Sequence, residues 1–529
     1  MYSHKENVNI LTALLVAHGV RHAVVCPGSR NSPIVHNLNE CPDVTCYPVT
    51  DERSAGFYAL GMTQALNEPV VVCVTSGTAL LNLMPSVAEA YYQHRPLIVV
   101  SADRPTAWID QLDGQTLPQP DALGRFVRKA VSLSEPTNDE ERWYCNRLVN
   151  EALMVAHAPV HINVPISEPL FLYDVPALPL QRKITLKETS LSTQTLTHIG
   201  RMFMQAKRPM LVCGQPLNAN IDEAVALVEN DERYVPDFVL YMGGAIVSKR
   251  LKRFLRQAKE TWAVNRTGEV NDTFMNLTQV IQGDEEEVAD YVQFLIEDQP
   301  HPFVRLWQEL LGRVRRHADT YEPAYSQMAA VKYFEQHVNE GFVHYANSMS
   351  IRLANIYARH SIFCNRGVNG IEGSLSTAAG FSVVSHLSPF STFHASTTNH
   401  PLPVFCVIGD LSFFYDQNAL WNQNLRGNFR ILLLNNGRGG IFNMLSGLEN
   451  SPACHRLVAA EHTATAEGIC RQNDIYYQQA KNMEEMKEGI DLLLSEDFSR
   501  PMLLEVFTDA DADEKTYRDY YQKTLSITQ

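Results

Sequence analysis

Short apolar runs alternate with segments of helical periodicity in the first third of the chain. Residues 7–18 carry apolar positions at helical spacing, and HAVVCPG (22–28) then predicts a short buried strand that ends in a turn. ERSAGFYALGMTQAL after Asp51 predicts a helix, and VVVCVTS (70–76) and PLIVVSA (96–102) predict further buried strands. This alternation favours a parallel sheet covered by helices on both faces, in which ligands bind at the carboxyl ends of the strands.

The same alternation restarts twice further along the chain. The proline-rich stretch VPISEPLFLYDVPALPL (164–180) predicts a linker. RPMLVCGQP and FVLYMGGAIVS are strand candidates in the middle section, which ends in the helix-like, acidic GDEEEVADYVQFLIED. A polar bridge over residues 295–330 precedes a last set of strand candidates, FVHYANS, PVFCVIGD, FRILLLNN and PMLLEVF. We therefore predict an α/β protein of three modules, each a parallel sheet covered by helices, over residues 1–180, 181–325 and 326–529.

Composition narrows the class of protein. The 529 residues are 45% hydrophobic and 19% charged, which is ample material for folded cores. The 44 Lys and Arg against 59 Asp and Glu give a net charge of −15, so we expect no nucleic-acid partner. No apolar run approaches the roughly 20 residues that span a membrane. The ten cysteines form no CxxC pair, and four lie in apolar strand-like runs, which favours a reduced, cytoplasmic enzyme.

The segment VFCVIGDLSFFYDQNALWNQNLRGNFRILLLNNGRGGIF, residues 404–442, carries the most informative pattern. One buried strand delivers Asp410 into a loop, and a second ends at Asn435 and Asn436, 26 positions after Asp410. Mg²⁺ prefers oxygen ligands in an octahedron and is usually shared with substrate phosphates. A carboxylate, an amide oxygen and a backbone carbonyl from neighbouring strand ends can supply half of that shell. Taken alone, the pattern is equally compatible with two unrelated polar loops.

This segment resembles the diphosphate-binding motif of thiamine-diphosphate enzymes, normally GDG followed at a distance by NN. Leu411 replaces the last glycine here, and Arg438 stands where a glycine commonly supplies the third metal ligand. Because that ligand is a backbone carbonyl, the side chain of Arg438 does not prevent it. The resemblance implies bound thiamine diphosphate and Mg²⁺ or Mn²⁺, with Asp410, Asn436 and Arg438 as the metal ligands.

Glu52 opens the predicted helix of YPVTDERSAGFYALG. A glutamate in the first turn of a helix most often only interacts with the helix dipole. In thiamine-diphosphate enzymes, however, one carboxylate beside the aminopyrimidine exchanges the proton that activates the cofactor. The resemblance therefore assigns the catalytic role to Glu52. The order of the modules, with the glutamate before the metal motif, resembles the pyruvate oxidase and decarboxylase group, whereas transketolases have the reverse order.

Further segments resemble one family more narrowly, the 2-succinyl-5-enolpyruvyl-6-hydroxy-3-cyclohexene-1-carboxylate synthases of menaquinone biosynthesis. In that family GDL is usual, so Leu411 fits the pattern. The middle module matches weakly, through SKRL at 248–251. The stronger matches are CPGSRNSP (26–33), SADRP (101–105), GQTLPQ (114–119), ANSMSIR (346–352) and CNRGVNGIEGSLSTAAG (364–380).

The resemblance implies a transferase that decarboxylates 2-oxoglutarate and adds the resulting succinyl carbanion to isochorismate in a conjugate, 1,4-fashion. Both substrates are dicarboxylates, so an acidic chain must concentrate positive charge locally, and arginine is suited to bidentate carboxylate binding. Any one of these arginines taken alone is better explained as a surface residue or a structural ion pair, whereas four of them in family motifs at strand ends favour a substrate pocket. The residues that the resemblance assigns to the substrate pocket are Ser29, Arg30, Arg104, Gln115, Lys249, Ser348, Arg352 and Arg366.

The resemblance also assigns the cofactor pocket. Ile371 matches the residue that supports the bent cofactor, and Ile441 and Phe442 match an apolar wall beside it, although ordinary core packing explains each of the three equally well. Because the cofactor of this superfamily spans modules of two subunits, we expect a homodimer or homotetramer. The complete expected cofactor-binding set is Glu52, Asn347, Ile371, Asp410, Leu411, Ser412, Asn436, Ile441 and Phe442.

Two other functions remain open. One is another thiamine-diphosphate carboligase or 2-oxo acid decarboxylase, which the four arginines, the GDL motif and the lack of an HH dipeptide disfavour. The other is a non-catalytic descendant of the fold. The joint presence of Glu52, Asp410 and Asn436 argues against that, since a protein without catalysis has no need to keep proton-transfer and metal-binding groups together.

Overall fold

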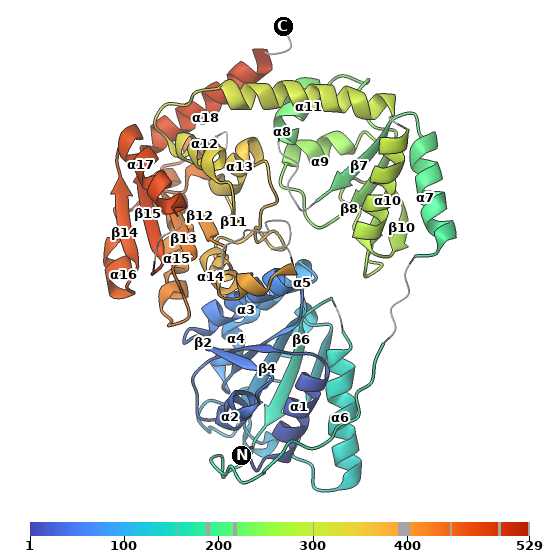
Figure 1. The fold of residues 1–529 in the computed structure, drawn as a ribbon, viewed down its shortest axis with the longest axis vertical. Helices are drawn as coiled ribbons and strands as arrows, with labels where there is room; N and C mark the ends of the chain where they lie inside the picture. Colours follow the sequence, from blue (N-terminus) through green and yellow to red (C-terminus); the bar gives the residue numbers. More distant parts are fainter. Residues whose placement is uncertain are drawn as a thin grey trace.

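Three helix-covered β-sheets follow one another along the chain in the computed structural model (Figure 1), in which neighbouring strands pair in parallel. Each sheet lies inside one of the three predicted ranges, which confirms the α/β class; the domain boundaries themselves stay predictions. The structure describes residues 1–155, 157–186, 191–214, 220–299, 301–389, 402–444, 447–495 and 499–526.

The first sheet has the strand order β2-β1-β3-β4-β6-β5. Its strands are β1 (His22–Val25), β2 (Thr45–Pro48), β3 (Val70–Val74), β4 (Leu97–Asp103), β5 (Lys129–Ser132) and β6 (Val160–Pro165). The surrounding helices are α1 (Glu6–Ala17), α2 (Ser32–Glu40), α3 (Glu52–Leu66), α4 (Thr78–Asn82), α5 (Met84–Tyr92) and α6 (Asp139–Leu153).

Strands β3 and β4 are buried along their whole length, which explains their continuous apolar sequence. The pattern did not predict β6, because His161 and Asn163 interrupt its apolar residues. Both polar side chains find partners inside the sheet, since His161 Nε2 lies 2.8 Å from Ser101 Oγ and Asn163 Nδ2 donates to Asp103 Oδ2 at 2.8 Å.

The second sheet has the order β10-β9-β8-β7. Its elements are α7 (Thr193–Gln205), β7 (Pro209–Cys213), α8 (Ile221–Val228), β8 (Phe238–Met242), α9 (Lys249–Leu255), β9 (Glu260–Asn265), β10 (Leu277–Gln282) and α10 (Glu285–Asp298).

The predicted polar bridge after residue 295 is wrong for its central part, which is the 19-residue helix α11 (Pro302–Thr320). Phe303, Trp307, Leu310 and Val314 are buried at helical spacing among charged residues. This helix runs from the second module toward the third (Figure 1).

The third sheet has the order β11-β12-β13-β15-β14. Its strands are β11 (Phe342–Tyr345), β12 (Val404–Gly409), β13 (Phe429–Asn435), β14 (Tyr476–Ala480) and β15 (Met502–Phe507). The helices are α12 (Gln327–His337), α13 (Met349–Tyr357), α14 (Ser374–Val384), α15 (Asp410–Tyr415), α16 (Glu467–Gln472), α17 (Met483–Leu494) and α18 (Ala510–Leu525).

Helices α3 and α14 join the first module to the third (Figure 1), and one apolar cluster continues through both. Their backbones touch: a Cβ atom on Gly61 would lie 1.9 Å from the Thr377 carbonyl oxygen, and one on Gly380 would lie 2.0 Å from that of Tyr58. Any larger residue at either glycine would separate the helices. The helix that begins at Glu52 is therefore held rigidly against the module that carries the metal motif.

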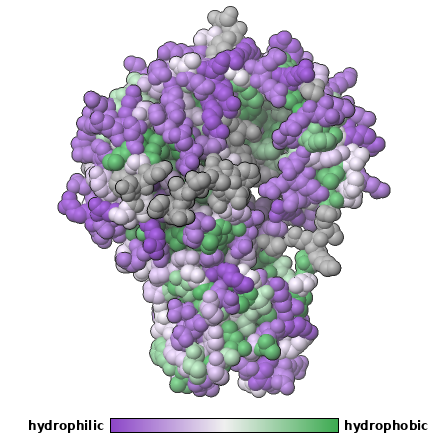
Figure 2. Space-filling view, in the orientation of Figure 1, coloured by the Kyte–Doolittle hydropathy of each residue, from purple (hydrophilic) through white to green (hydrophobic). Residues whose placement is uncertain are grey.

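The face of the molecule in Figure 2 is largely hydrophilic, with apolar patches between the polar side chains. Among the described residues, no helix combines the length and the apolar character that a membrane span requires.

Candidate active site

Asp410 and Asn436 meet at one edge of the third sheet. Strands β12 and β13 are neighbours, with Gly409 opposite Leu434, so both chains leave the sheet side by side. Asp410 Oδ2 accepts hydrogen bonds from the backbone N–H groups of Asn436 (3.1 Å) and Gly437 (2.8 Å), and its Oδ1 accepts one from Leu411 N–H (2.7 Å). The structure thus brings together the two residues that the 26-residue spacing paired.

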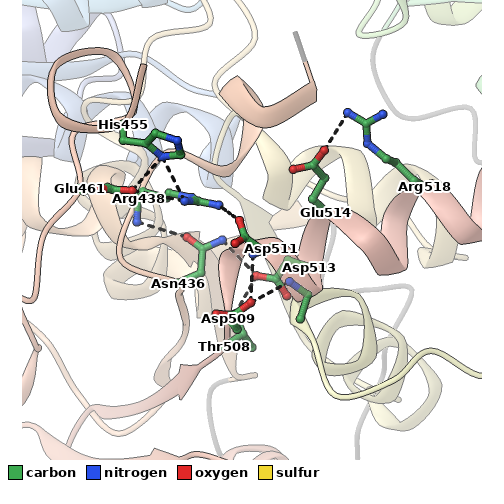
Figure 3. A network of polar contacts seen from close by, with 11 residues as sticks. Asn436, Arg438, His455, Glu461, Thr508, Asp509, Asp511, Asp513, Glu514 and Arg518 are labelled. Carbon is green, nitrogen blue, oxygen red and sulfur yellow. Dashed lines mark hydrogen bonds and ion pairs between the residues drawn. The ribbon is translucent and has the colours of Figure 1, made fainter. Parts of the chain in front are cut away.

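The side chains of Asn436 and Arg438 turn in different directions (Figure 3). Asn436 Nδ2 donates to Asp513 Oδ2 at 3.0 Å, and Arg438 N–H approaches Asn436 Oδ1 at 3.4 Å. The guanidinium of Arg438 binds Asp511 and, at 3.3 Å, Glu461. Because these carboxylates hold the Arg438 side chain, its charge is balanced beside the proposed metal ligands.

These groups fit a divalent ion bound to a diphosphate. The carboxylate and the amide offer hard oxygen donors at one strand edge. A cavity of about 390 Å³ lies beside them, lined by Asn436, Gly437, Arg438 and Thr508 among others. His462 Nε2 lies 3.5 Å from Asp410 Oδ2, and that carboxylate raises the pKa of His462. The motif did not predict this histidine, which follows Asp410 by 52 positions (462 − 410).

The expected apolar cofactor residues surround the same edge. Ile371 is 38% exposed and lies in the loop that precedes α14. Ser412 Oγ donates to the Ile371 carbonyl, so Ser412 holds that loop against α15. A Cβ atom on Gly439 would lie 2.8 Å from the Phe442 ring and 3.3 Å from Leu411 Cδ1, so these two side chains lie on the same side of the backbone at Gly439. Ile441 and Phe442 both lie in the 3-10 helix η6 (Gly440–Met444).

Asn347 holds the loop that carries Arg366. Its Nδ2 donates to the carbonyls of Asn365 (2.6 Å) and Gly370 (2.7 Å), and its Oδ1 accepts from Arg366 Nη1 at 2.8 Å. Glu89 of the first module fastens the same loop, accepting from the N–H groups of the two residues after Arg366 at 2.6 Å each. No pattern in the sequence pointed to Glu89, whose partners lie 278 and 279 positions away.

Glu52 opens α3, as its sequence context predicts. Its Oε2 accepts from Asn82 Nδ2 at 3.2 Å. The preceding Asp51 caps the helix, accepting from two N–H groups of the first turn, and its Oδ2 accepts from Asn418 Nδ2 at 2.7 Å. Arg53 Nη2 donates to the Tyr415 carbonyl at 3.0 Å, at the end of the helix that Asp410 begins. The Glu52 end of α3 is therefore fixed to the third module on both sides.

Half of the expected substrate residues form a group in the first module. Buried Arg30 donates to the Ile166 carbonyl at 2.9 Å and pairs with Glu168 at 2.9 Å. Arg104 follows β4 and lies 3.5 Å from Asp113. Burial lowers the pKa of Arg30, and the neighbouring Arg104 contributes to the shift. The remaining two members of the group are Ser29, exposed just after β1, and Gln115, in a left-handed backbone conformation with φ 56°.

The other half forms a group where the second and third modules meet. Lys249 is the first residue of α9, Arg352 lies in α13 after Ser348, and Arg366 lies in the Asn347 loop. Burial lowers the pKa of Arg366, and Arg352 contributes to the shift. Burial also lowers the pKa of Lys252, with contributions from Arg366 and Lys249. The structure therefore adds Lys252 to this cationic group, from the same short basic run as Lys249.

Comparisons with known proteins bear on the fold and the family of the chain. Residues 6–123 match the family model described as "Thiamine pyrophosphate enzyme, N-terminal TPP binding domain". A Mycobacterium smegmatis protein, solved by X-ray crystallography and assigned as thiamin diphosphate-dependent, superimposes with a TM-score of 0.70 over 96% of this chain and 100% of that one, at 16% identity. Residues 6–123 therefore carry the N-terminal domain of thiamine-pyrophosphate enzymes, and the chain as a whole shares the fold of the Mycobacterium smegmatis protein.

Several curated relatives extend over the whole chain. A protein of Bacteroides fragilis is 42% identical over 572 aligned residues, covering 99% of this chain and 100% of its own. One of Bacteroides thetaiotaomicron is 41% identical with 99% of both chains covered, and one of Christiangramia forsetii is 33% identical with 98% and 99% covered. All three are named 2-succinyl-5-enolpyruvyl-6-hydroxy-3-cyclohexene-1-carboxylate synthase, and this chain belongs to that family.

Proposed function

We propose that the protein is a transferase of menaquinone biosynthesis that decarboxylates 2-oxoglutarate and adds the succinyl unit to isochorismate by 1,4-addition, giving 2-succinyl-5-enolpyruvyl-6-hydroxy-3-cyclohexene-1-carboxylate. The observation that carries this proposal is the 42% identity, over essentially the full length of both chains, to a relative that bears the name of this synthase. The cationic group around Arg366 supports it, because both substrates carry two carboxylates.

The metal and cofactor sites follow from the third sheet. Asp410, the Asn436 amide oxygen and the Arg438 carbonyl would hold Mg²⁺ or Mn²⁺ against the diphosphate. Thiamine diphosphate, when bound, supplies the nucleophilic carbon and the electron sink that decarboxylation requires. Asn347 and Ser412 would orient the diphosphate end. Ile371, Leu411, Ile441 and Phe442 would exclude water from the reacting centre.

The chain's own acid–base and charged groups perform the remaining tasks. The Glu52 carboxyl would hold and return a proton at the pyrimidine ring. Arg352, Arg366 and Lys249 would bind substrate carboxylates from one side, with Ser348 beside them. Arg30, Arg104, Ser29 and Gln115 would bind them from the other side.

We also propose a homodimer or homotetramer, because the two groups of substrate residues lie in different modules and a second copy can unite them. A cytoplasmic location, with no nucleic-acid or membrane partner, suits small-molecule substrates and the ten cysteines, which form no disulfide in the described part of the chain.

Product formation from purified protein with thiamine diphosphate and Mg²⁺ tests the function. We expect carbon dioxide release from 2-oxoglutarate and, only when isochorismate is present as acceptor, loss of the ultraviolet absorbance of its conjugated ring diene as the coupled product forms. Coupling of two pyruvate molecules instead would identify another carboligase. Retention of the cofactor without turnover of any 2-oxo acid would identify a non-catalytic protein.

A further inference from the structure

The amide of Asn436 can bind a metal ion through only one of its two ends. Its oxygen is a ligand, whereas its NH₂ group repels a cation, and the two ends have nearly the same shape. A rotation of the amide by half a turn would therefore convert a metal ligand into a group that opposes the metal. Some neighbour must determine which end faces the site.

Asp513, in the first turn of α18, is that neighbour (Figure 3). Its Oδ2 accepts from Asn436 Nδ2 at 3.0 Å and from Thr508 Oγ1 at 2.8 Å, and its Oδ1 accepts from Gln327 N–H at 2.8 Å. All three partners are donors, as an ionised carboxylate requires. Asn436 can meet this acceptor only with its NH₂ group, so its Oδ1 faces away from Asp513, where Arg438 N–H approaches it at 3.4 Å.

We propose that Asp513 is a positioning residue that fixes the Asn436 amide with its oxygen toward the metal. This inference rests on the metal site proposed above. The flipped amide would set two oxygens against each other and lose a hydrogen bond to a charged acceptor, so the carboxylate strongly favours one orientation. Asp513 itself would not touch the ion.

Thr508 and Gln327 fix the orientation of the Asp513 carboxylate. Gln327 is the first residue of α12 and Thr508 directly follows β15, so two separate elements of the third module fix the Asp513 carboxylate. A carboxylate held on both oxygens cannot rotate away from Asn436. Partners that orient metal ligands in this way typically contribute about 10- to 100-fold in metal affinity.

Asp513→Asn is the direct test, because it keeps the shape and places an NH₂ group among three donors. The new amide must direct its donor toward Gln327 N–H or toward Asn436, and in the second case Asn436 restores a hydrogen bond only by flipping. We expect Mn²⁺ affinity, measured by electron paramagnetic resonance with thiamine diphosphate present, to fall about 10- to 100-fold. Asp513→Ala removes the acceptor altogether, and wild-type Mn²⁺ affinity in both folded variants, D513N and D513A, would overturn the proposal.

The double variant N436D/D513N supplies the rescue. Because the two oxygens of a carboxylate are equivalent, Asp at position 436 can accept from the NH₂ group of Asn at position 513 with one oxygen and present the other oxygen to the metal. We expect Mn²⁺ affinity to recover to near the wild-type value, well above that of D513N. If D513N does not fold, the double variant is compared with N436D, whose two facing carboxylates repel each other. A double variant that binds no more tightly than the single variant contradicts the proposal.

Asp509→Asn is the matched control. Asp509 lies in the same turn and caps α18 by accepting from two N–H groups, a role that asparagine also fills. It removes the same charge without changing a partner of Asn436, so Mn²⁺ affinity should stay near wild type. Asp410→Ala distinguishes an error in the proposed metal site from an error in the role of Asp513. If D410A retains wild-type Mn²⁺ affinity, the proposed metal site is wrong. If D410A loses Mn²⁺ affinity and neither D513N nor D513A does, only the role of Asp513 is rejected.

Discussion

The two cationic groups of the candidate site differ in how their charge is balanced. In the first module Arg30 pairs with Glu168 and Arg104 with Asp113. At the junction of the second and third modules, Lys249, Lys252, Arg352 and Arg366 form no ion pair with any residue that the structure describes. The hydrogen bond of Arg366 to Asn347 Oδ1 is to a neutral oxygen.

This difference indicates different roles for the two groups. A substrate carboxylate must compete with Glu168 and Asp113 in the first group, so its gain there is small. In the second group, the repulsion among neighbouring cations is relieved by a bound anion. We therefore expect the second group to provide most of the binding energy for the substrate carboxylates, and the first group mainly to orient them.

The largest effects are expected from substitutions of Glu52 in the first module, which should impair proton transfer, and of Asp410 in the third module, which should impair cofactor binding. Glu52→Gln keeps the shape of the side chain but cannot exchange the proton, so turnover should fall by about 10²–10⁴-fold with cofactor affinity nearly unchanged. The measurement is hydrogen–deuterium exchange at C2 of bound thiamine diphosphate, with thermal stability as the control. Exchange as fast as in wild type would mean that another group performs this step.

Asp410→Ala should have the opposite profile. Removal of the carboxylate eliminates a ligand of the ion that holds the diphosphate, so calorimetry should detect neither Mg²⁺ nor thiamine diphosphate retention in the folded protein. Unchanged cofactor affinity would place the diphosphate site elsewhere.

Substitution of the arginines tests whether the two cationic groups contribute differently to substrate binding. Arg366→Ala and Arg352→Ala should each lower kcat/KM by about 30- to 4,000-fold, since truncation of one partner of a buried charge pair typically costs about 2–5 kcal/mol. Arg104→Ala should have a smaller effect, because Asp113 already offsets its charge. Steady-state kinetics in both substrates provide the measurement, and calorimetry should show cofactor affinity near wild type throughout. Equal losses in the two groups would remove the distinction between them.

Two buried carboxyl groups, Glu89 and Glu223, differ in their hydrogen bonds, and this difference predicts a pH dependence of the unfolding free energy. Glu89, between the first and third modules, accepts two N–H groups, whereas Glu223 of α8 accepts from Tyr520 Oη of α18 at 3.0 Å and has one oxygen without a partner among the described residues. Burial raises the pKa of Glu223 to about 7. Between pH 4.5 and 7 the folded protein keeps a proton that the unfolded chain has released, so stability decreases as pH rises.

Glu223→Gln should remove this penalty. We expect the variant to exceed wild type in unfolding free energy at pH 8, by up to roughly 3 kcal/mol, and by much less at pH 5. Urea unfolding at both pH values gives the comparison, with exposed Glu232→Gln as the control that should show no such pH dependence. The same difference at pH 5 and pH 8 would show that Glu223 is ionised throughout.

The smallest effect should come from Asp113→Asn, which frees Arg104. Because exposed ion pairs contribute less than about 1 kcal/mol, we expect KM for a dicarboxylate substrate to fall by no more than a few-fold. Asp110→Asn removes the same charge from the same loop and should leave KM unchanged. A higher KM in the Asp113 variant would mean that the ion pair positions Arg104 rather than competing with substrate.

Local sequence patterns correctly predicted those elements whose burial or spacing depends on residues close together in the chain or on adjacent strands. The apolar runs of β3, β12 and β13 are buried on both faces, so composition alone identified them. The Asp410–Asn436 spacing works because neighbouring parallel strands end at one edge. Glu52 was recognisable as a helix-opening residue after a strand. The sequence pattern did not predict helix α11, because its apolar stripe is narrow among many charged residues. It did not predict β6 either, because the polar residues of this strand find their partners only on neighbouring strands.

The sequence by itself therefore determined the α/β class, the succession of three sheets and the pairing of Asp410 with Asn436, since these depend on contacts between near neighbours along the chain or adjacent strands. Only the tertiary structure decided which cations are balanced and which are not, that Glu89 fastens the Arg366 loop, and that Asp513 meets Asn436 from 77 positions away. The physical reason is that ion pairs and hydrogen bonds act over a few ångströms in space, and no local pattern reveals which distant segments the folded core brings to that distance.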